Sequence, residues 1–309
     1  MTRPTRTERR PVTTDRPRHD RVHDDGAFAP EGRHPSMNRA HAPNRRDVIA
    51  GASRLAVLGV AGASGLAAPG LVRRARAGRA VGGVVELFTS QGCSSCPPAD
   101  AVLGELIANG EAIGLAHHVD YWDYLGWADP LATKEGTQRQ YAYATTFNRR
   151  GVYTPQAVVN GREHHVGSRG TAIRQALAEH DASRLAPGLD VAIEATGGTA
   201  RVSVAPGSPR PTNAVAAKTV ATETVVTVMH YVETHTEAIG RGENRGREIT
   251  YHHPVLSFET LGRWTGGAIE MAVDLPPLPA PGGMAVLVQE QLGRAPGAIL
   301  GAAALTRSG

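Results

Sequence analysis

The chain contains two cysteines, Cys93 and Cys96, which are separated by two serines. An apolar run at residues 84–88 leads into this Cys-x-x-Cys motif. A stretch with leading prolines and helical apolar spacing, residues 97–109, follows it. A strand that leads into a Cys-x-x-Cys at the start of a helix is typical of a thioredoxin-type redox site. The spacing therefore predicts a redox-active dithiol.

The two cysteines are expected to have different roles. At the start of a helix, unpaired N–H groups and the helix dipole stabilise a thiolate and lower its pKa, which favours Cys93 as the attacking sulfur. Cys96, one turn into the helix and more buried, would resolve the mixed disulfide. A purely structural disulfide is the alternative, although closing so short a loop removes little chain entropy.

A metal site is another alternative to a redox dithiol. Two thiolates with a histidine are ligands for Zn²⁺ or Cu⁺, whereas a four-cysteine site is impossible in this chain. Neighbouring residues of a strand point to opposite faces, so at most one histidine of an adjacent pair reaches the cysteines. The sequence therefore predicts a redox disulfide without a further cofactor, with zinc or copper as the alternative. The candidate ligands are His117 and His118 and, less favoured, His164 and His165.

Aromatic and acidic residues are dense between residues 118 and 129, in a chain that is 5% aromatic. A loop that follows the second parallel strand emerges at the carboxyl edge of the sheet, beside the cysteine loop. Tyr121 and Trp122 are therefore candidates for the wall of a substrate site. His118 and Asp120 are candidates for proton transfer to the thiols. The alternative is a loop whose aromatic side chains pack on one another.

The pattern alternates between strands and helices up to about residue 183. Read in order it is βαβαββα, which right-handed crossovers turn into a small sheet covered on both faces. This is the core order of a thioredoxin-like fold. The predicted strands are residues 84–89, 113–119, 156–160 and 162–166, and the predicted helices are residues 97–108, 133–147 and 169–180.

From about residue 185 the pattern consists of short β-type runs between glycine and proline clusters. This pattern is typical of a β-sandwich or an open barrel. We therefore expect an α/β thioredoxin-like domain at residues 81–183, followed by an all-β, sandwich-like domain at residues 186–305.

The basic residues gather in the first quarter of the chain. Residues 1–77 hold 15 Lys+Arg and 7 Asp+Glu, a formal charge of +8, while the whole chain carries +4. The remainder is therefore at −4, so the positive total gives no support for nucleic-acid binding. Residues 1–44 combine Arg, Pro, Asp and His with almost no aliphatic residue and are expected to be disordered.

Residues 45–77 resemble a twin-arginine export signal. Arg45 and Arg46 precede a weakly apolar stretch, and Ala75-Arg76-Ala77 supplies a small-x-small cleavage pattern. Met37 is a candidate for the true start of the chain. These features predict export to the periplasm or the cell exterior, with no stable membrane span once the signal is cleaved.

Six blocks of the chain form a recognisable set. They are Glu86-Leu-Phe-Thr-Ser-Gln-Gly-Cys-Ser-Ser-Cys-Pro-Pro-Ala-Asp100, His118-Val-Asp-Tyr-Trp-Asp123, Gly126-Trp-Ala-Asp-Pro130, Gly151-Val-Tyr-Thr-Pro-Gln156, Gly242-Glu-Asn-Arg-Gly246 and Gly297-Ala-Ile-Leu-Gly301. Together they resemble the exported bacterial proteins called the domain of unknown function 1223 family. The resemblance covers about residues 83–305, and that family is regarded as thioredoxin-like.

The resemblance implies further site residues. A thioredoxin-like fold carries a cis-proline that faces its cysteines, and Pro155, just ahead of the third predicted strand, occupies that place. Tyr153 and Thr154 would lie beside it, where a bound peptide backbone pairs in thioredoxins.

The sequence thus predicts an exported thiol–disulfide oxidoreductase that acts through Cys93 and Cys96 on an exported protein or a small thiol. The alternative is a non-catalytic binding module of the same fold. Its cysteines would form a structural disulfide or would hold a metal with histidine. Neither reading predicts an oligomeric state.

Overall fold

The structure is a computed structural model of the 309-residue chain. It describes residues 73–76, 83–180, 189–208 and 222–307. The chain divides into two compact units, Met1–Ala63 and Ser64–Gly309, and all described residues belong to the second unit. Within the described ranges no helix is long and apolar enough to span a membrane. The leader and most of the export signal predicted from the sequence lie outside the described residues.

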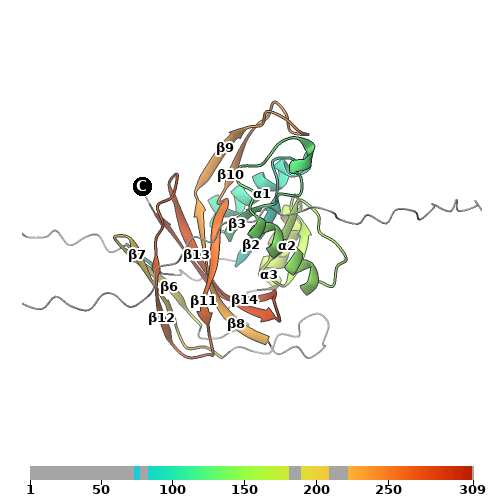
Figure 1. The fold of residues 1–309 in the computed structure, drawn as a ribbon. Helices are drawn as coiled ribbons and strands as arrows, with labels where there is room; N and C mark the ends of the chain where they lie inside the picture. The colour runs from blue at the N-terminus through green and yellow to red at the C-terminus, as the bar shows by residue number, and fades with distance from the viewer. Residues whose placement is uncertain (1–72, 77–82, 181–188, 209–221, 308–309) are drawn as a thin grey trace, which may run out of the picture. The chain divides into compact units, whose positions relative to one another are not determined.

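Residues 84–179 form a mixed four-stranded sheet with its helices (Figure 1). In chain order the elements are β2 (Val84–Thr89), α1 (Pro97–Ala108), β3 (Ile113–His118), the 3₁₀ turn η1 (Asp123–Leu125), α2 (Lys134–Thr146), β4 (Gln156–Val159), β5 (Glu163–Val166) and α3 (Gly170–Glu179). The strand order of this mixed sheet is β3–β2–β4–β5. β2 and β3 are parallel, whereas β4 and β5 join the sheet antiparallel to their neighbours.

The other described strands form two four-stranded sheets and a hairpin. The outer sheet has the order β1 (Arg73–Arg76), β6 (Val191–Thr196), β7 (Thr199–Val204), β12 (Ile269–Asp274). The central sheet has the order β11 (Val255–Arg263), β8 (Thr222–Val232), β13 (Gly282–Leu292), β14 (Ala295–Arg307). The hairpin consists of β9 (Thr234–Ala238) and β10 (Glu248–His252).

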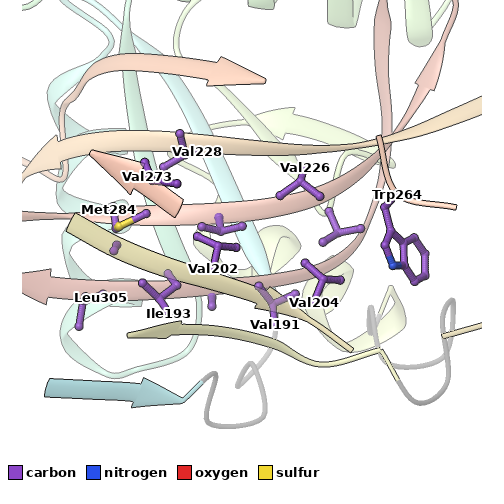
Figure 2. Close-up of a cluster of buried hydrophobic side chains, with 14 of the residues drawn as sticks. Val191, Ile193, Val202, Val204, Val226, Val228, Trp264, Val273, Met284 and Leu305 are labelled. Atoms are coloured by element: carbon purple, nitrogen blue, oxygen red, sulfur yellow. The ribbon is translucent and has the colours of Figure 1, made fainter. Parts of the chain in front are cut away.

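Both faces of the central sheet are buried. Met284 and Val286 of β13 pack with the outer sheet, in the cluster drawn in Figure 2. Leu287, on the opposite face of β13, packs with Val84 and Leu115 of the mixed sheet. A strand buried on both faces has a continuous apolar run instead of an alternation, which is why β13 contains Met-Ala-Val-Leu-Val without interruption.

The other face of the mixed sheet is covered by helices. Val85 and Leu87 of β2 pack on Leu103 and Leu106 of α1 and on Ile173 of α3. Leu103 and Leu106 are three residues apart, so they lie on one stripe of α1 that faces the sheet. This packing fixes the start of α1, and with it the cysteines, against the end of β2.

A buried ion pair connects β2, α2 and β13. The fully buried Glu86 carboxylate accepts a hydrogen bond from Arg139 Nε at 2.5 Å, and Arg139 also donates to Gln289 Oε1 at 2.9 Å. Burial by itself raises the pKa of Glu86, but the Arg139 and His117 side chains hold that pKa well below its usual range. Arg139 therefore has a structural role and is not available to a substrate.

The end of the predicted export signal lies in the outer sheet. Arg73–Arg76 form β1, which pairs antiparallel with β6. Cleavage after Ala77 would remove β1 and leave β6 as an edge strand of that sheet. The predicted boundary near residues 183–186 falls in the segment 181–188, outside the described residues, and Ser64–Gly309 form one unit.

The fold class predicted from the sequence is wrong. The described residues form fourteen strands and three α-helices, so the structure is predominantly β and is not an α/β thioredoxin-like domain followed by a β domain. The physical reason is that one face of the mixed sheet packs on the central sheet and is not covered by helices alone. A sandwich-like arrangement of β-sheets does fit, because the outer and central sheets pack face to face.

Packing of the central sheet on the mixed sheet can be tested at Leu287. Because this side chain is fully buried between the two sheets, Leu287→Ala should lower the free energy of unfolding by about 2–5 kcal/mol in urea denaturation. Val166→Ala, on the exposed edge strand β5, should lower it by less than about 1 kcal/mol. Equal effects of the two substitutions would contradict the packing.

Candidate functional site

The cysteine loop, residues 90–96, connects β2 to α1. Backbone bonds close its turns, from Cys93 N to Ser90 O and from Cys96 N to Cys93 O, both at 3.2 Å. Cys96 is the N-cap of α1, and prolines occupy the first helical positions, where a missing N–H is not needed. The two sulfur atoms are joined in a disulfide, with the Cα atoms 5.4 Å apart.

Both cysteines are covered, whereas the two serines between them are exposed. Cys93 is 1% exposed and Cys96 is 0% exposed. The expected difference in burial between an attacking and a resolving cysteine is therefore absent. In this state both cysteines are shielded from solvent, so a thiol in solution cannot reach the disulfide directly.

The cover is the loop between β9 and β10, residues 239–247, which we call the covering loop. Asn244, fully buried, donates from Nδ2 to the carbonyl oxygens of Gln91 and Cys93, both at 2.9 Å. The exposed Glu243 carboxylate accepts a hydrogen bond from Ser94 N at 3.0 Å. The Gly242-Glu-Asn-Arg-Gly246 block thus contacts the cysteine loop, and its glycines adopt the positive φ angles that this tight loop requires.

The hairpin that carries the covering loop lies against α1 (Figure 1). A Cβ added at Gly104 of α1 would lie 2.6 Å from His252 Cδ2 of β10, so a larger residue there would force the His252 ring to move. The segment after β10 is held on β3, because Ala116 N donates to His253 O at 3.0 Å. The covering loop is therefore supported at its base by the helix and the sheet that carry the cysteines.

Pro155 lies beside the first turn of α1. The Thr154–Pro155 peptide bond is cis. Gly167 sits between Pro155 and the helix, since a Cβ added at Gly167 would lie 3.2 Å from Pro155 Cβ and 2.8 Å from Ala99 Cβ. The cis isomer is the one that the family resemblance implied for this proline, whereas its contact with the cysteines stays a prediction.

The four predicted substrate residues lie together. Trp122 Nε1 donates to Thr154 Oγ1 at 2.8 Å. Tyr121 donates to Gln140 Oε1 at 3.1 Å, and Gln140 Nε2 donates to the carbonyl oxygen of Tyr153 at 2.8 Å. A Cβ added at Gly92 would lie 3.0 Å from Trp122 Cβ, which places this group directly beside the cysteine loop. All four side chains are partly exposed.

The two predicted proton-transfer residues have different surroundings. His118 is buried beside the cysteine loop, and its Nδ1 donates to Asp129 Oδ2 at 2.7 Å. The same carboxylate oxygen accepts Gln91 N at 2.9 Å. Asp120 instead accepts a hydrogen bond from the Thr137 hydroxyl on α2 at 2.7 Å. Of the two candidates, the structure connects His118 to the cysteine loop, through Asp129.

Asp100 is a site residue that the sequence analysis missed. Its backbone N donates to Cys96 O at 3.1 Å, so it lies one helical turn after Cys96, and its carboxyl accepts the Thr89 hydroxyl at 3.1 Å. Burial raises the pKa of Asp100 to about 7, although His118 and Thr89 act in the opposite direction. The signal was available in the spacing, because residues four apart on a helix share a face.

Asp129, from the acidic segment between residues 118 and 129, also lies in the site, and it differs from Asp100 in charge. Burial raises the pKa of Asp129, but the His118 side chain and the N–H groups of Gln91 and Leu131 lower it overall. His118 Nε2 is buried without a hydrogen-bond partner. The buried residues next to the cysteine loop thus include the ionised carboxylate of Asp129 and the carboxyl of Asp100, which titrates near neutrality. They also include the His118 Nε2 atom, which can still form a hydrogen bond.

The candidate metal ligands are engaged elsewhere. His117 donates from Nε2 to Glu86 at 3.0 Å, while His118 is bound to Asp129. His164 Nδ1 lies 2.9 Å from the Tyr153 hydroxyl, and His165 pairs with Glu163 at 3.1 Å. Among the described residues, the group with ligand atoms close enough for a metal is Glu163, Glu179 and His180, which includes neither cysteine. A zinc or copper site at the cysteines remains a prediction.

The raised pKa of Asp100 predicts that the free energy of unfolding depends on pH. The pKa is about 7 in the folded chain and about 4 in the unfolded chain, so the folded state retains this proton between pH 4 and pH 7. The contribution of Asp100 to stability should therefore fall as pH rises through that window, by on the order of 4 kcal/mol.

Urea unfolding of the wild type and of Asp100→Asn from pH 4 to pH 8 measures this contribution. The stability of the wild type relative to the variant should decline up to about pH 7 and then stay constant. Parallel stability curves would show that the carboxyl titrates normally.

Comparison with known proteins gives a family and one structural relative. Residues 84–289 match the family model described as protein of unknown function (DUF1223). The crystal structure of protein AGR_C_4864 from Agrobacterium tumefaciens is similar at 36% sequence identity and a TM-score of 0.62, over 73% of this chain and 94% of that one. No curated protein matches the chain. Because the family model spans more than half of the 309 residues, the chain belongs to the DUF1223 family of proteins of unknown function.

Proposed function

We propose that this protein catalyses thiol–disulfide exchange through Cys93 and Cys96. The observation that carries the proposal is the disulfide at the N-terminus of α1, where the helix dipole stabilises a thiolate after reduction. The Ser95 hydroxyl lies 3.3 Å from Cys93 Sγ and is a hydrogen-bond donor for the same anion. Both features favour Cys93 as the reactive sulfur.

The exchange proceeds in two steps that conserve electrons. In the reduced protein the Cys93 thiolate attacks a substrate disulfide, so that a mixed disulfide forms and one substrate thiolate leaves. Cys96 then attacks Cys93 Sγ, which releases the second substrate thiol and leaves the protein disulfide. Two electrons pass from the protein dithiol to the substrate, and the reverse sequence oxidises a substrate dithiol.

The second step requires that Cys96 loses a proton. Asp100 is the first candidate acceptor, because it lies one turn along the same buried helix face and its pKa is raised to about 7. His118 is the second, since its Nε2 has no partner and its electrostatic field acts on Asp100. Asp120 is not part of this proposal because its carboxylate is held by Thr137.

The partner in this proposal is an exported protein or a small thiol outside the cytoplasm. Arg45, Arg46 and the Ala75-Arg76-Ala77 pattern support export, and a disulfide persists in the oxidising compartments that export reaches. The chemistry needs no cofactor beyond the cysteine pair. Tyr121, Trp122, Tyr153 and Thr154 form the partly exposed surface next to the cysteine loop on which a substrate would lie.

A non-catalytic binding module with a structural disulfide is the second candidate function, and the burial of both cysteines favours it. The reduction potential separates the two. Structural disulfides in exported proteins have potentials below about −300 mV, whereas catalytic ones are less reducing.

The proposal predicts that reduction of insulin disulfides by dithiothreitol is accelerated by the wild-type protein and not by Cys93→Ser. Cys96→Ser should retain the attacking thiol and accumulate a mixed disulfide that mass spectrometry detects. Ser203→Ala, which removes a hydroxyl on β7 of the outer sheet, is the matched control and should retain activity within about twofold. A wild type that adds nothing to the rate of dithiothreitol alone would contradict the proposal.

If the covering loop limits the access of thiols to the disulfide, loosening the loop should speed up reduction. Asn244→Ala removes two hydrogen bonds. The buried Gln91 carbonyl loses this donor, whereas the Cys93 carbonyl keeps its bond from Cys96 N, and the loss should cost about 1–3 kcal/mol in the closed state. The disulfide should then be reduced by dithiothreitol roughly tenfold faster. Arg245→Ala, at the exposed neighbouring position, should leave the rate unchanged. If both variants react at the wild-type rate, the loop does not limit access.

A further inference from the structure

Two arginines converge on Tyr153 at the edge of the proposed substrate surface. The Arg149 guanidinium carbon lies 5.0 Å from the centroid of the Tyr153 ring. Arg149 and Arg169 both act electrostatically on the Tyr153 hydroxyl. The two arginines are exposed, and neither has a carboxylate partner among the described residues. Arg149 therefore lies against the Tyr153 ring, and Arg169 is a second exposed cation whose charge acts on the same side chain.

The surface next to these arginines is connected to the disulfide by short contacts. Tyr153 precedes Thr154, whose hydroxyl accepts Trp122 Nε1 at 2.8 Å. Trp122 in turn packs on Gly92, the residue before Cys93. A substrate whose sulfur reaches Cys93 would therefore extend over Trp122 and Thr154 toward the arginines.

Asp120 and Asp123 adjoin Trp122 at the cysteine end of this path, so the charge at the Tyr153 end has to be considered separately. Between residues 148 and 170 the acidic residue is Glu163, and its carboxylate is engaged by His165 at 3.1 Å and by His180 at 2.9 Å. Glu243 lies on the other side of the cysteine loop, at Ser94. The Tyr153 end of the surface is thus positive at neutral pH, while the body of the chain carries net negative charge.

We propose that Arg149 and Arg169 bind a carboxylate of the substrate, so that the preferred substrates are anionic thiols and disulfides. This inference rests on the proposed function and names its substrate class. Planar guanidinium groups bind carboxylates through paired hydrogen bonds, and an exposed positive patch also raises the rate of encounter with anions. A small thiol and an acidic peptide would be recognised by the same feature, a carboxylate a few bonds from the reacting sulfur.

The test measures exchange between the reduced full-length protein and disulfides of different charge. Protein dithiol and substrate disulfide give protein disulfide and two substrate thiols. The probes are 3,3′-dithiodipropionate, 2-hydroxyethyl disulfide and cystamine, which carry two negative charges, no charge and two positive charges. Each rate is divided by the rate of the same probe with dithiothreitol, which corrects for intrinsic reactivity. Glutathione disulfide and a disulfide-linked acidic peptide then distinguish small from peptide substrates.

The wild type should prefer the dianionic probe, and added salt should weaken that preference. Arg149→Gln and Arg169→Gln should each lower the rate with the dianion by about two- to fivefold and leave the neutral probe unchanged. Arg201→Gln, an exposed arginine on the outer sheet, is the matched control and should change none of the rates. Equal corrected rates for all three probes, in the wild type and the variants, would overturn the inference but leave the proposed function intact.

If no probe is exchanged, the proposed function is contradicted, and a binding measurement then tests whether Arg149 and Arg169 bind a carboxylate. Suberate is a non-reactive dicarboxylate with as many chain atoms between its carboxyl groups as dithiodipropionate. In nuclear magnetic resonance titrations of the oxidised protein it should shift the backbone signals of Tyr153 and Thr154, and the shifts should vanish in the double variant Arg149→Gln/Arg169→Gln. Absence of shifts in the wild type would overturn the inference independently of catalysis.

Discussion

The structure of the described residues depends on the burial of both faces of the central sheet. One face, with Met284 and Val286, closes the core against the outer sheet, and the other, with Leu287, closes the core against β2 and β3. The mixed sheet also has a second apolar face, with Val85 and Leu87, but α1 and α3 cover that face. The strands β8 and β13 therefore hold together the segments on either side of them, and the Glu86–Arg139–Gln289 contacts fix the position of α2 in the same junction.

The same sheet brings the covering loop to the cysteines. β8 ends at Val232 and β9 begins at Thr234, so the hairpin continues directly from a strand of the central sheet. Because that sheet is packed on β2 and β3, the hairpin extends along α1, and Asn244 reaches the carbonyls on either side of Gly92. Residues more than 140 positions apart in the chain thereby share one site. The cover over the disulfide is a consequence of the packing and not of any local sequence feature.

The sequence predicted the local elements well and their assembly poorly. Helices at 97–108, 134–146 and 170–179 and strands at 84–89 and 156–159 lie where apolar spacing placed them, and the contact between Trp122 and Thr154 joins two predicted site residues. The role of Asn244 could not be predicted, because a polar residue in a glycine-rich loop gives no sign of its distant partners. The two-sided burial of β13 was equally hidden, since a continuous apolar run shows that a strand is buried but not which sheets cover it.

The buried carboxyls beneath the disulfide show how one site assigns different charges to the same chemical group. Asp129 accepts hydrogen bonds from His118, Gln91 N and Leu131 N, and these donors stabilise its anion enough to outweigh desolvation. Asp100 receives a single hydroxyl bond from Thr89, so desolvation dominates and its proton is retained to near neutrality. Asp100 is also the one that lies a helical turn from Cys96. A group that is half ionised at neutral pH both accepts and returns a proton at little cost, and the exchange that we propose at Cys96 would require such a group.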